Sequence, residues 1–172
     1  MKRMGLLLAC GFVGALAMVG WAQEHQHGAQ APLPAFEKLK SLAGEWKGTY
    51  GEKKQPSEVA YRVVSNGTVV EETLKNADSK DMVTLYYRDG DRLMMTHYCS
   101  IGNQPRMAAR PMKDGKTLVF SFVDVTNLVS PQDGHMHAME LTFDAANRIT
   151  HRWTWRQAGK DTKPEVFEFT RK

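Results

Sequence analysis

The chain has 172 residues, of which 24% are charged, and its formal net charge at pH 7 is +4. This length fits one domain of ordinary size. Acidic and basic residues are nearly balanced and no basic run stands out, which argues against a nucleic-acid-binding protein.

The first 22 residues have the pattern of an export signal. Lys2 and Arg3 precede the apolar stretch Gly5–Trp21, and small residues surround a cleavage position after Ala22. Cleavage there leaves 172 − 22 = 150 residues with a net charge of 21 − 19 = +2. The residues that end at Cys10 (Leu-Leu-Ala-Cys) resemble a lipobox, but the apolar stretch continues for eleven residues beyond it, which favours an ordinary signal peptide.

We therefore expect a periplasmic or secreted protein, without a stable membrane anchor after the signal is removed. The apolar stretch is about 17 residues long, and a transmembrane helix needs about 20. Cys99 is then the one remaining cysteine, so an internal disulfide is excluded and stability must come from a core.

Residues 23–34 are polar, contain Gly and Pro and lack periodicity, which predicts a flexible leader before a domain at 35–172. Its His25 could join a free amino terminus in binding Cu(II) or Ni(II). A simple tether is the interpretation that we favour for this leader.

The domain begins with a short helix and continues as strands. In Ala35–Ala43 apolar residues recur at helical spacing, and Gly44 ends the helix. From there the period is two, and the connections are too short for the crossover helices of a parallel sheet. An antiparallel meander avoids exposed edges best by closing into a barrel. The predicted strands are Glu45–Tyr50, Ser57–Ser65, Thr68–Lys75, Asp81–Arg88, Asp91–Cys99, Pro105–Met112, Lys116–Val123, His135–Asp144, Arg148–Arg156 and Pro164–Thr170.

The hairpin that turns at residues 66–67 has a register that can be predicted from its turn. Residues 66–67 are Asn-Gly, a strong two-residue turn signal. Counting back from it places Arg62 opposite Glu71 and Glu58 opposite Lys75, two pairs of opposite charge. The same count places a further set on the other, inward face: Val59, Tyr61, Val63, Val70, Glu72 and Leu74.

The second hairpin is predicted from the unbroken alternation of residues 147–156. A three-residue loop, Ala145–Asn147 with Asn147 left-handed, pairs Phe143 with Ile149. The next pairs are Leu141 with His151, Met139 with Trp153 and, on the outer face, Glu140 with Arg152. The predicted inward side chains of this hairpin are Met139, Leu141, Ile149, His151, Trp153 and Trp155.

Two segments resemble known families. Gly44-x-Trp46 resembles the opening of the calycins, the lipocalin and fatty-acid-binding-protein group, in which a tryptophan of the first strand packs at the base of the barrel. Ten strands are more similar to the fatty-acid-binding and nitrobindin branch. Separately, His97–Arg106 resembles a segment of exported bacterial lipocalin-like proteins of unassigned function. The resemblance covers Phe36–Lys172 and implies an all-β antiparallel meander, closed into a ten-stranded calycin-like barrel with one short N-terminal helix.

A barrel of this size can fill its interior or hold one small ligand. We predict a non-enzymatic binding protein for a small hydrophobic or amphipathic ligand, with neither a cofactor nor a metal; an ordinary packed core is the alternative. The seven methionines that remain after cleavage suit an adaptable lining. The ligand-binding candidates are Trp46, Glu72, His97, Tyr98, Asn103, Gln104, Arg106, Met139, His151 and Trp153.

Two other functions stay open. The resemblance to nitrobindins implies haem held by one histidine, and His137 or His151 could serve by position. An enzyme would use the rim at His97 and Cys99, but these positions lie about 7 Å apart along a strand, too far for a nucleophile and its base. His135 and His137 have the spacing of metal ligands, but a third ligand is missing.

Arg106 follows the turn Gly102–Pro105 and has two interpretations. Pointing inward, its guanidinium could bind the anionic end of a ligand. It could instead pair with Glu72, because an inward glutamate needs a cation or a raised pKa. The sequence leaves both open, and it also allows Asn103 and Gln104 simply to shape the turn.

Overall fold

Strands make up most of the chain, as the alternation predicts. The computed structural model describes residues 31–77, 81–110 and 114–172, and the predicted signal peptide and most of the leader lie outside them. Ala31–Lys172 forms one compact unit, which begins with helix α1 (Pro34–Lys40). The strands are β1 (Gly44–Tyr50), β2 (Gln55–Val64), β3 (Val69–Asn76), β4 (Met82–Asp89), β5 (Arg92–Tyr98), β6 (Gln104–Arg110), β7 (Thr117–Thr126), β8 (His135–Ala145), β9 (Arg148–Gln157), β10 (Lys160–Asp161) and β11 (Glu165–Arg171).

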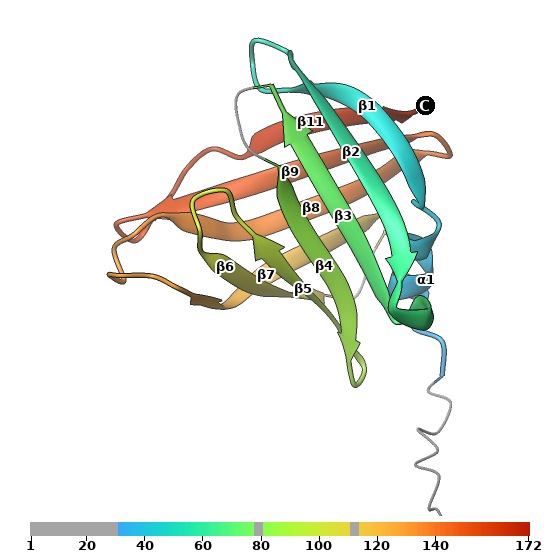
Figure 1. The fold of residues 1–172 in the computed structure, drawn as a ribbon, viewed down its shortest axis with the longest axis horizontal. Coiled ribbons are helices and arrows are strands. Elements are labelled where there is room, and N and C mark those ends of the chain that lie inside the picture. Colours follow the sequence, from blue (N-terminus) through green and yellow to red (C-terminus); the bar gives the residue numbers. More distant parts are fainter. Residues whose placement is uncertain (1–30, 78–80, 111–113) are drawn as a thin grey trace, which may run out of the picture. The chain divides into compact units, whose positions relative to one another are not determined.

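These strands form one antiparallel sheet that closes on itself. Each strand from β1 to β8 pairs with the next along the chain, and β11 pairs with both β9 and β1. The two-residue β10 extends the sheet only beside β9. The result is a closed ten-stranded barrel with one short helix, which confirms the predicted fold class (Figure 1). Closure gives every long strand in the described part of the chain two neighbours, which removes the exposed edges of an open sheet.

The predicted registers of both hairpins are confirmed. Arg62 lies opposite Glu71 across β2 and β3, and the turn between them closes with a hydrogen bond from Thr68 N to Ser65 O at 3.1 Å. Across β8 and β9 the observed pairs match the prediction: Phe143 with Ile149, Leu141 with His151, Glu140 with Arg152 and Met139 with Trp153.

Three local details of the prediction are wrong. Val63 is 41% exposed instead of inward, because it stands beside the turn at the rim of the barrel. Asn147 does not have a positive φ, since a register shift between Phe143 and Ala145 leaves a two-residue turn. The helix ends at Lys40, earlier than predicted, and the chain continues in a tight turn before β1.

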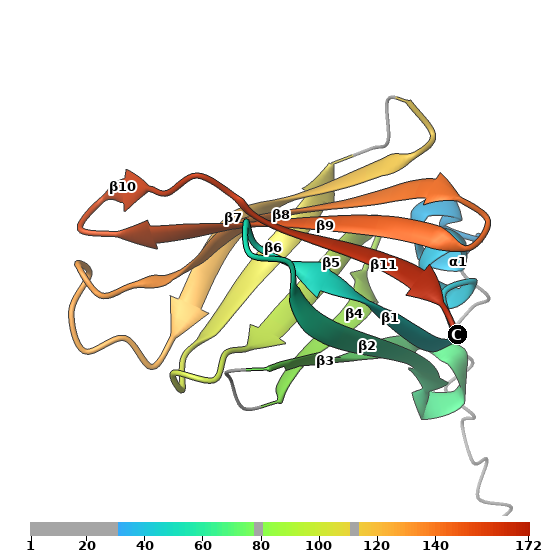
Figure 2. The same ribbon diagram turned by 90° about the horizontal axis from the view of Figure 1, so that it is seen from above.

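One end of the barrel is closed by α1 and the turn that follows it. Phe36 and Leu39 of α1 are buried against the interior, as is Leu42. Trp46 packs at this base, as the resemblance implies, and its Nε1 donates to the Leu42 carbonyl at 2.9 Å. The Arg171 guanidinium lies over the Trp46 ring, 4.2 Å from its centroid, and donates to two carbonyl oxygens of the turn after α1. Figure 2 shows α1 at the end of the barrel that holds the C-terminus, with β10 at the opposite end.

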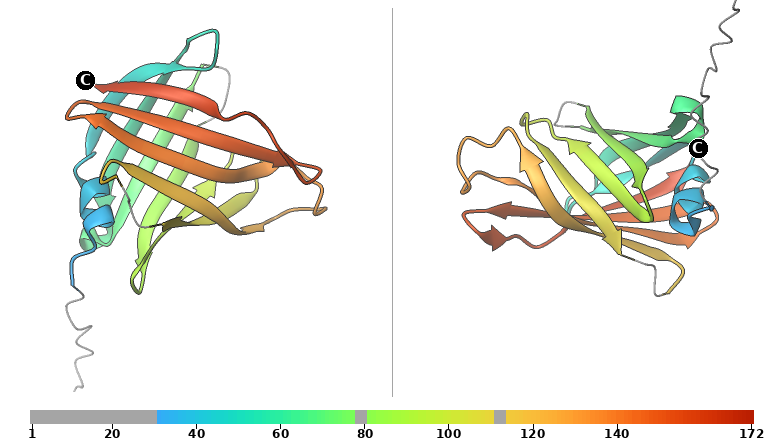
Figure 3. Two further views of the ribbon diagram at one scale, coloured as in Figure 1. Left: turned by 180° about the vertical axis from the view of Figure 1, so that it is seen from behind. Right: turned by 90° about the horizontal axis from the view of Figure 1, so that it is seen from below.

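The interior next to α1 is filled by side chains from all around the wall. Phe120, Leu141 and Phe169 are fully buried there together with Met107. Figure 3 shows β8, β9 and β11 running side by side along one wall, and these strands carry many of the aromatic core residues. In the part of the chain that the structure describes, no helix combines the length and apolar character needed to cross a bilayer.

Candidate functional site

A cavity opens at the end of the barrel opposite α1. Its volume is about 360 Å³. The cavity lies where β1 ends at Tyr50 and β4 begins at Met82. The side chains of α1, which fill the opposite end of the barrel, do not reach it. The lining is mostly apolar and aromatic, with polar groups among it: Tyr50, Leu74, Asn76, Met82, His97, Met136, Trp153, Trp155, Thr162, Lys163, Glu165 and Phe167.

A row of buried polar side chains crosses the interior next to this cavity. Tyr61 of β2 lies opposite Glu72 of β3, and Glu72 lies opposite Thr84 of β4. Thr84 in turn lies opposite His97 of β5, and its Oγ1 is 2.9 Å from His97 Nδ1. Because side chains directly opposite each other have Cβ atoms about 5 Å apart, each member can reach the next. His151 of β9 extends the row, since its Nε2 lies 2.8 Å from the Tyr61 hydroxyl.

Glu72 is the ionisable centre of this row. Its Oε2 accepts a hydrogen bond from the Tyr86 hydroxyl at 2.7 Å, while its Oε1 has no partner of normal geometry. Burial raises the pKa of Glu72 from 4.5 to about 7, and the hydroxyls of Tyr86, Tyr61 and Thr84 oppose this rise. The carboxyl is therefore divided between its protonated and ionised forms near neutral pH.

Both interior histidines are neutral at pH 7. Burial lowers the pKa of His97 to about 4 and that of His151 to about 3. The His97 ring lies 4.7 Å from the Trp153 ring, measured between centroids. His97 Nε2 and Trp153 Nε1 are buried without a hydrogen-bond partner, and both side chains line the cavity.

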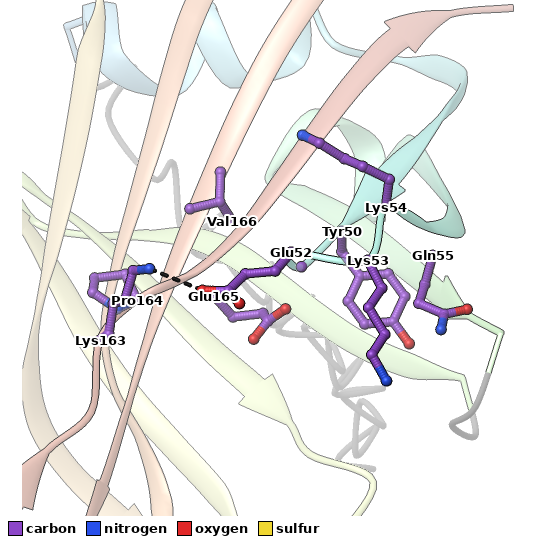
Figure 4. Close-up of a pocket in the computed structure, with 10 residues that line it drawn as sticks. Tyr50, Glu52, Lys53, Lys54, Gln55, Lys163, Pro164, Glu165 and Val166 are labelled. Atoms are coloured by element: carbon purple, nitrogen blue, oxygen red, sulfur yellow. Dashed lines mark hydrogen bonds and ion pairs between the residues drawn. The ribbon is translucent and has the colours of Figure 1, made fainter.

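An outer groove of about 610 Å³ lies at the cavity mouth, between the loop after β1 and the segment that leads into β11. Lys163 Nζ pairs with Glu52 Oε1 at 3.2 Å and links the two sides (Figure 4). Tyr50, Lys163 and Glu165 line both the groove and the cavity. The groove is charged and exposed, so it marks an entrance and not an enclosed binding site.

Of the residues predicted to bind ligand, His97 and Trp153 line the cavity. Glu72, Met139 and His151 are fully buried in the interior but do not line it. Trp46 lies at the closed end, where it packs under Arg171, and Asn103 is buried in the turn before β6, where its Nδ2 donates to the Gly134 carbonyl.

The remaining candidates lie outside the barrel interior. Tyr98 is 45% exposed, and Gln104 accepts a hydrogen bond from Thr126 at 2.6 Å. The inward orientation considered for Arg106 is wrong: its neighbours Pro105 and Met107 are buried, so alternation turns Arg106 outward, where it pairs with Asp124. A Glu72–Arg106 pair therefore does not form.

The histidine pair His135–His137 and Cys99 are the other residues with side chains suited to chemistry. His135 Nδ1 lies 3.2 Å from the Asp133 carbonyl, which can only accept, and His135 Nε2 lies 3.3 Å from His137 Nδ1. Within residues 31–77, 81–110 and 114–172 no group of three or more His, Cys, Asp or Glu side chains is placed to hold a metal ion. Cys99 is half-buried against the core, and His97 uses its Nδ1 to bond Thr84 and not the thiol.

Several site residues are missing from the sequence-based list. Met136 and Phe167 of the cavity wall belong to β8 and β11, which were predicted as strands without a ligand role. Tyr61 and Thr84 complete the polar row, and Tyr61 was predicted inward without a role. Extending the strand-to-strand count from the Asn66-Gly67 hairpin into the next strands places Thr84 beside Glu72, and it places His97, already a predicted ligand-binding residue, beside Thr84.

Comparisons with known proteins support the fold. No protein-family model matches the chain, and no curated protein does. Among solved structures, the chain is similar to the one described as "Crystal Structure of Rv2717c from M. tuberculosis", with a TM-score of 0.54 and 16% sequence identity. The likeness covers 83% of this chain and 99% of that chain. At this identity it shows a shared barrel fold alone.

Proposed function

We propose that the protein is a non-enzymatic binding protein that holds a small, mostly apolar ligand in the cavity at the open end of the barrel. The observation that carries the proposal is the cavity itself. Its volume of about 360 Å³ lies within the range of roughly 300–1,000 Å³ that ligand pockets occupy. Leu74, Met82 and Phe167 supply apolar wall, and methionine can adapt its shape to a ligand.

The lipocalin-like resemblance and the predicted export signal agree with this proposal. A carrier outside the cytoplasm needs a stable shell and one accessible mouth, and the barrel combines a base closed by α1 with an open opposite end. We therefore propose a periplasmic or secreted carrier whose partner is a hydrophobic or amphipathic small molecule.

Haem is the second candidate, because His97 is neutral and its Nε2 has no partner within the protein. The residues as they stand do not fit it. His97 Nε2 is buried beside the Trp153 ring, His151 Nε2 is held by Tyr61, and His137 lies against His135 and Phe122. Haem ligation by any of these histidines would require side-chain movement.

The test combines native mass spectrometry and a visible spectrum of the protein purified from its own host with titration of the neutral probe N-phenyl-1-naphthylamine. We expect a co-purifying small molecule or saturable probe fluorescence, and no Soret band. Met136→Trp places a large ring at the cavity and should abolish probe binding, whereas Val123→Trp adds the same ring at an exposed outer position and should not. Equal probe binding by folded Met136→Trp and Val123→Trp would contradict the proposal, and a Soret band would favour haem.

A further inference from the structure

The inner surface of the cavity carries two ring nitrogens with unmet hydrogen bonds. Nε2 of His97 and Nε1 of Trp153 are both buried and unpartnered, on side chains that line the cavity and lie against each other. Leaving a buried polar group unpaired is unfavourable. A ligand that supplies partners for both nitrogens would remove that penalty.

The two nitrogens differ in the hydrogen bonds that they can make. Trp153 Nε1 carries a hydrogen and can only donate. His97 is neutral and has one N–H, so its Nε2 accepts a hydrogen bond in one tautomer and donates one in the other. His97 Nδ1 lies 2.9 Å from the Thr84 hydroxyl, which can donate or accept, so this contact fits either tautomer.

Charge at the inner surface disfavours an ionised ligand end. The charged lining residues, Lys163 and Glu165, are exposed and belong to the mouth. Behind His97 the next ionisable group is the Glu72 carboxyl, reached through Thr84. A carboxylate placed there would be buried near another carboxyl group without a counter-charge. An ammonium group could not accept the hydrogen of Trp153.

From this arrangement we infer that the ligand's buried end is uncharged and carries both a donor and an acceptor, as an alcohol, a phenol or a primary amide does. The group accepts from Trp153 Nε1–H, and it donates to His97 Nε2 or accepts from it according to the tautomer of the imidazole. Because both nitrogens are buried, the two rings must turn toward the cavity to make these bonds. The apolar body of the ligand then lies against Leu74, Met82 and Phe167. The inference rests on the proposed function, because it assigns the polarity of the ligand that this cavity would hold.

The test uses three probes of one ring system: naphthalene, 2-naphthol and 2-naphthoate, each competed against N-phenyl-1-naphthylamine at pH 7.5. We expect 2-naphthol to bind about tenfold more tightly than naphthalene, the effect of one net hydrogen bond, and 2-naphthoate to bind most weakly. His97→Phe should reduce the ratio of the 2-naphthol affinity to the naphthalene affinity about tenfold, because a change in the shape of the cavity affects both probes. Trp153→Phe, which keeps an aromatic ring, should do the same and serves if the first variant fails to fold.

The possible outcomes separate the two claims. Equal affinities for naphthalene and 2-naphthol in the unaltered protein would overturn the inference while leaving an apolar binding cavity in place. A preference for 2-naphthoate would overturn it as well. If none of the probes, including N-phenyl-1-naphthylamine, binds the folded protein, the proposed function itself is overturned.

Discussion

Replacing Glu72 by glutamine should change how the stability of the protein depends on pH. The folded protein holds the Glu72 proton up to about pH 7, whereas the unfolded chain releases it near pH 4.5. Between these values the folded state binds more protons than the unfolded state, so the carboxyl group lowers the free energy of unfolding as pH rises. At about 1.4 kcal/mol per pH unit, the loss amounts to about 3 kcal/mol over the whole interval.

The two interior histidines act in the opposite direction. Their pKa values are lowered by burial to about 4 and about 3, so the unfolded chain binds their protons at higher pH than the folded protein does. Between pH 4.5 and 6.5 each histidine therefore raises the free energy of unfolding by about 1.4 kcal/mol per pH unit. The three groups together give a net rise of about 1.4 kcal/mol per pH unit, and Glu72→Gln should about double that slope.

The assay is urea unfolding, followed by tryptophan fluorescence, at pH 4.5, 5.5, 6.5 and 7.5. The free energy of unfolding of Glu72→Gln minus that of the unaltered protein should increase by about 3 kcal/mol across this series. Glu71→Gln, which makes the same substitution on the outer face of the same strand, is the matched control. A difference that stays constant within about 0.5 kcal/mol would refute the reasoning, because the burial of Glu72 would then not affect its proton affinity.

Two further substitutions test the architecture. Arg171→Ala removes a guanidinium that stacks on Trp46 and donates to two carbonyl oxygens. We expect the free energy of unfolding, measured with urea, to fall by about 2–3 kcal/mol. The control is Lys47→Ala at an exposed position on β1, and an Arg171→Ala effect no larger than the control would contradict this role. Arg106→Ala should leave both the melting temperature and the probe affinity unchanged, because Arg106 and Asp124 pair on the outer face and exposed ion pairs contribute little. Loss of probe binding in Arg106→Ala, measured by titration, would show that the residue reaches the ligand.

Local patterns in the sequence were enough to predict the ten longer strands and the registers of two hairpins. Alternation and the Asn-Gly turn are properties of a few neighbouring residues, so the pairing of Arg62 with Glu71 follows from counting alone. The face of Arg106 could not be obtained in this way, because the count is interrupted by the turn before β6. Short β10 carries too few residues for any alternation to show.

The cavity could not be predicted, because it depends on strands that meet only when the barrel closes. Tyr61 and His151 are 90 residues apart in the chain yet share a hydrogen bond. Whether a space remains between Met82, Met136 and Phe167 depends on the shapes of side chains from three distant segments. Sequence periodicity shows which side chains face inward, and it says nothing about how well they fill the interior.

The pairing of β1 with β11 also sets the order in which this protein can fold. Most neighbouring strands are consecutive and can zip together as hairpins, but Trp46 meets Arg171 across almost the whole length of the domain. Bringing together residues so far apart in the chain has an entropic cost of loop closure, and this slows folding. As the chain emerges from its N-terminal end, β1 lacks its β11 partner until the last strand is available. We therefore expect the pairing of β1 with β11 to be a slow step of folding. Until it forms, the unpaired strand edges can pair with other chains.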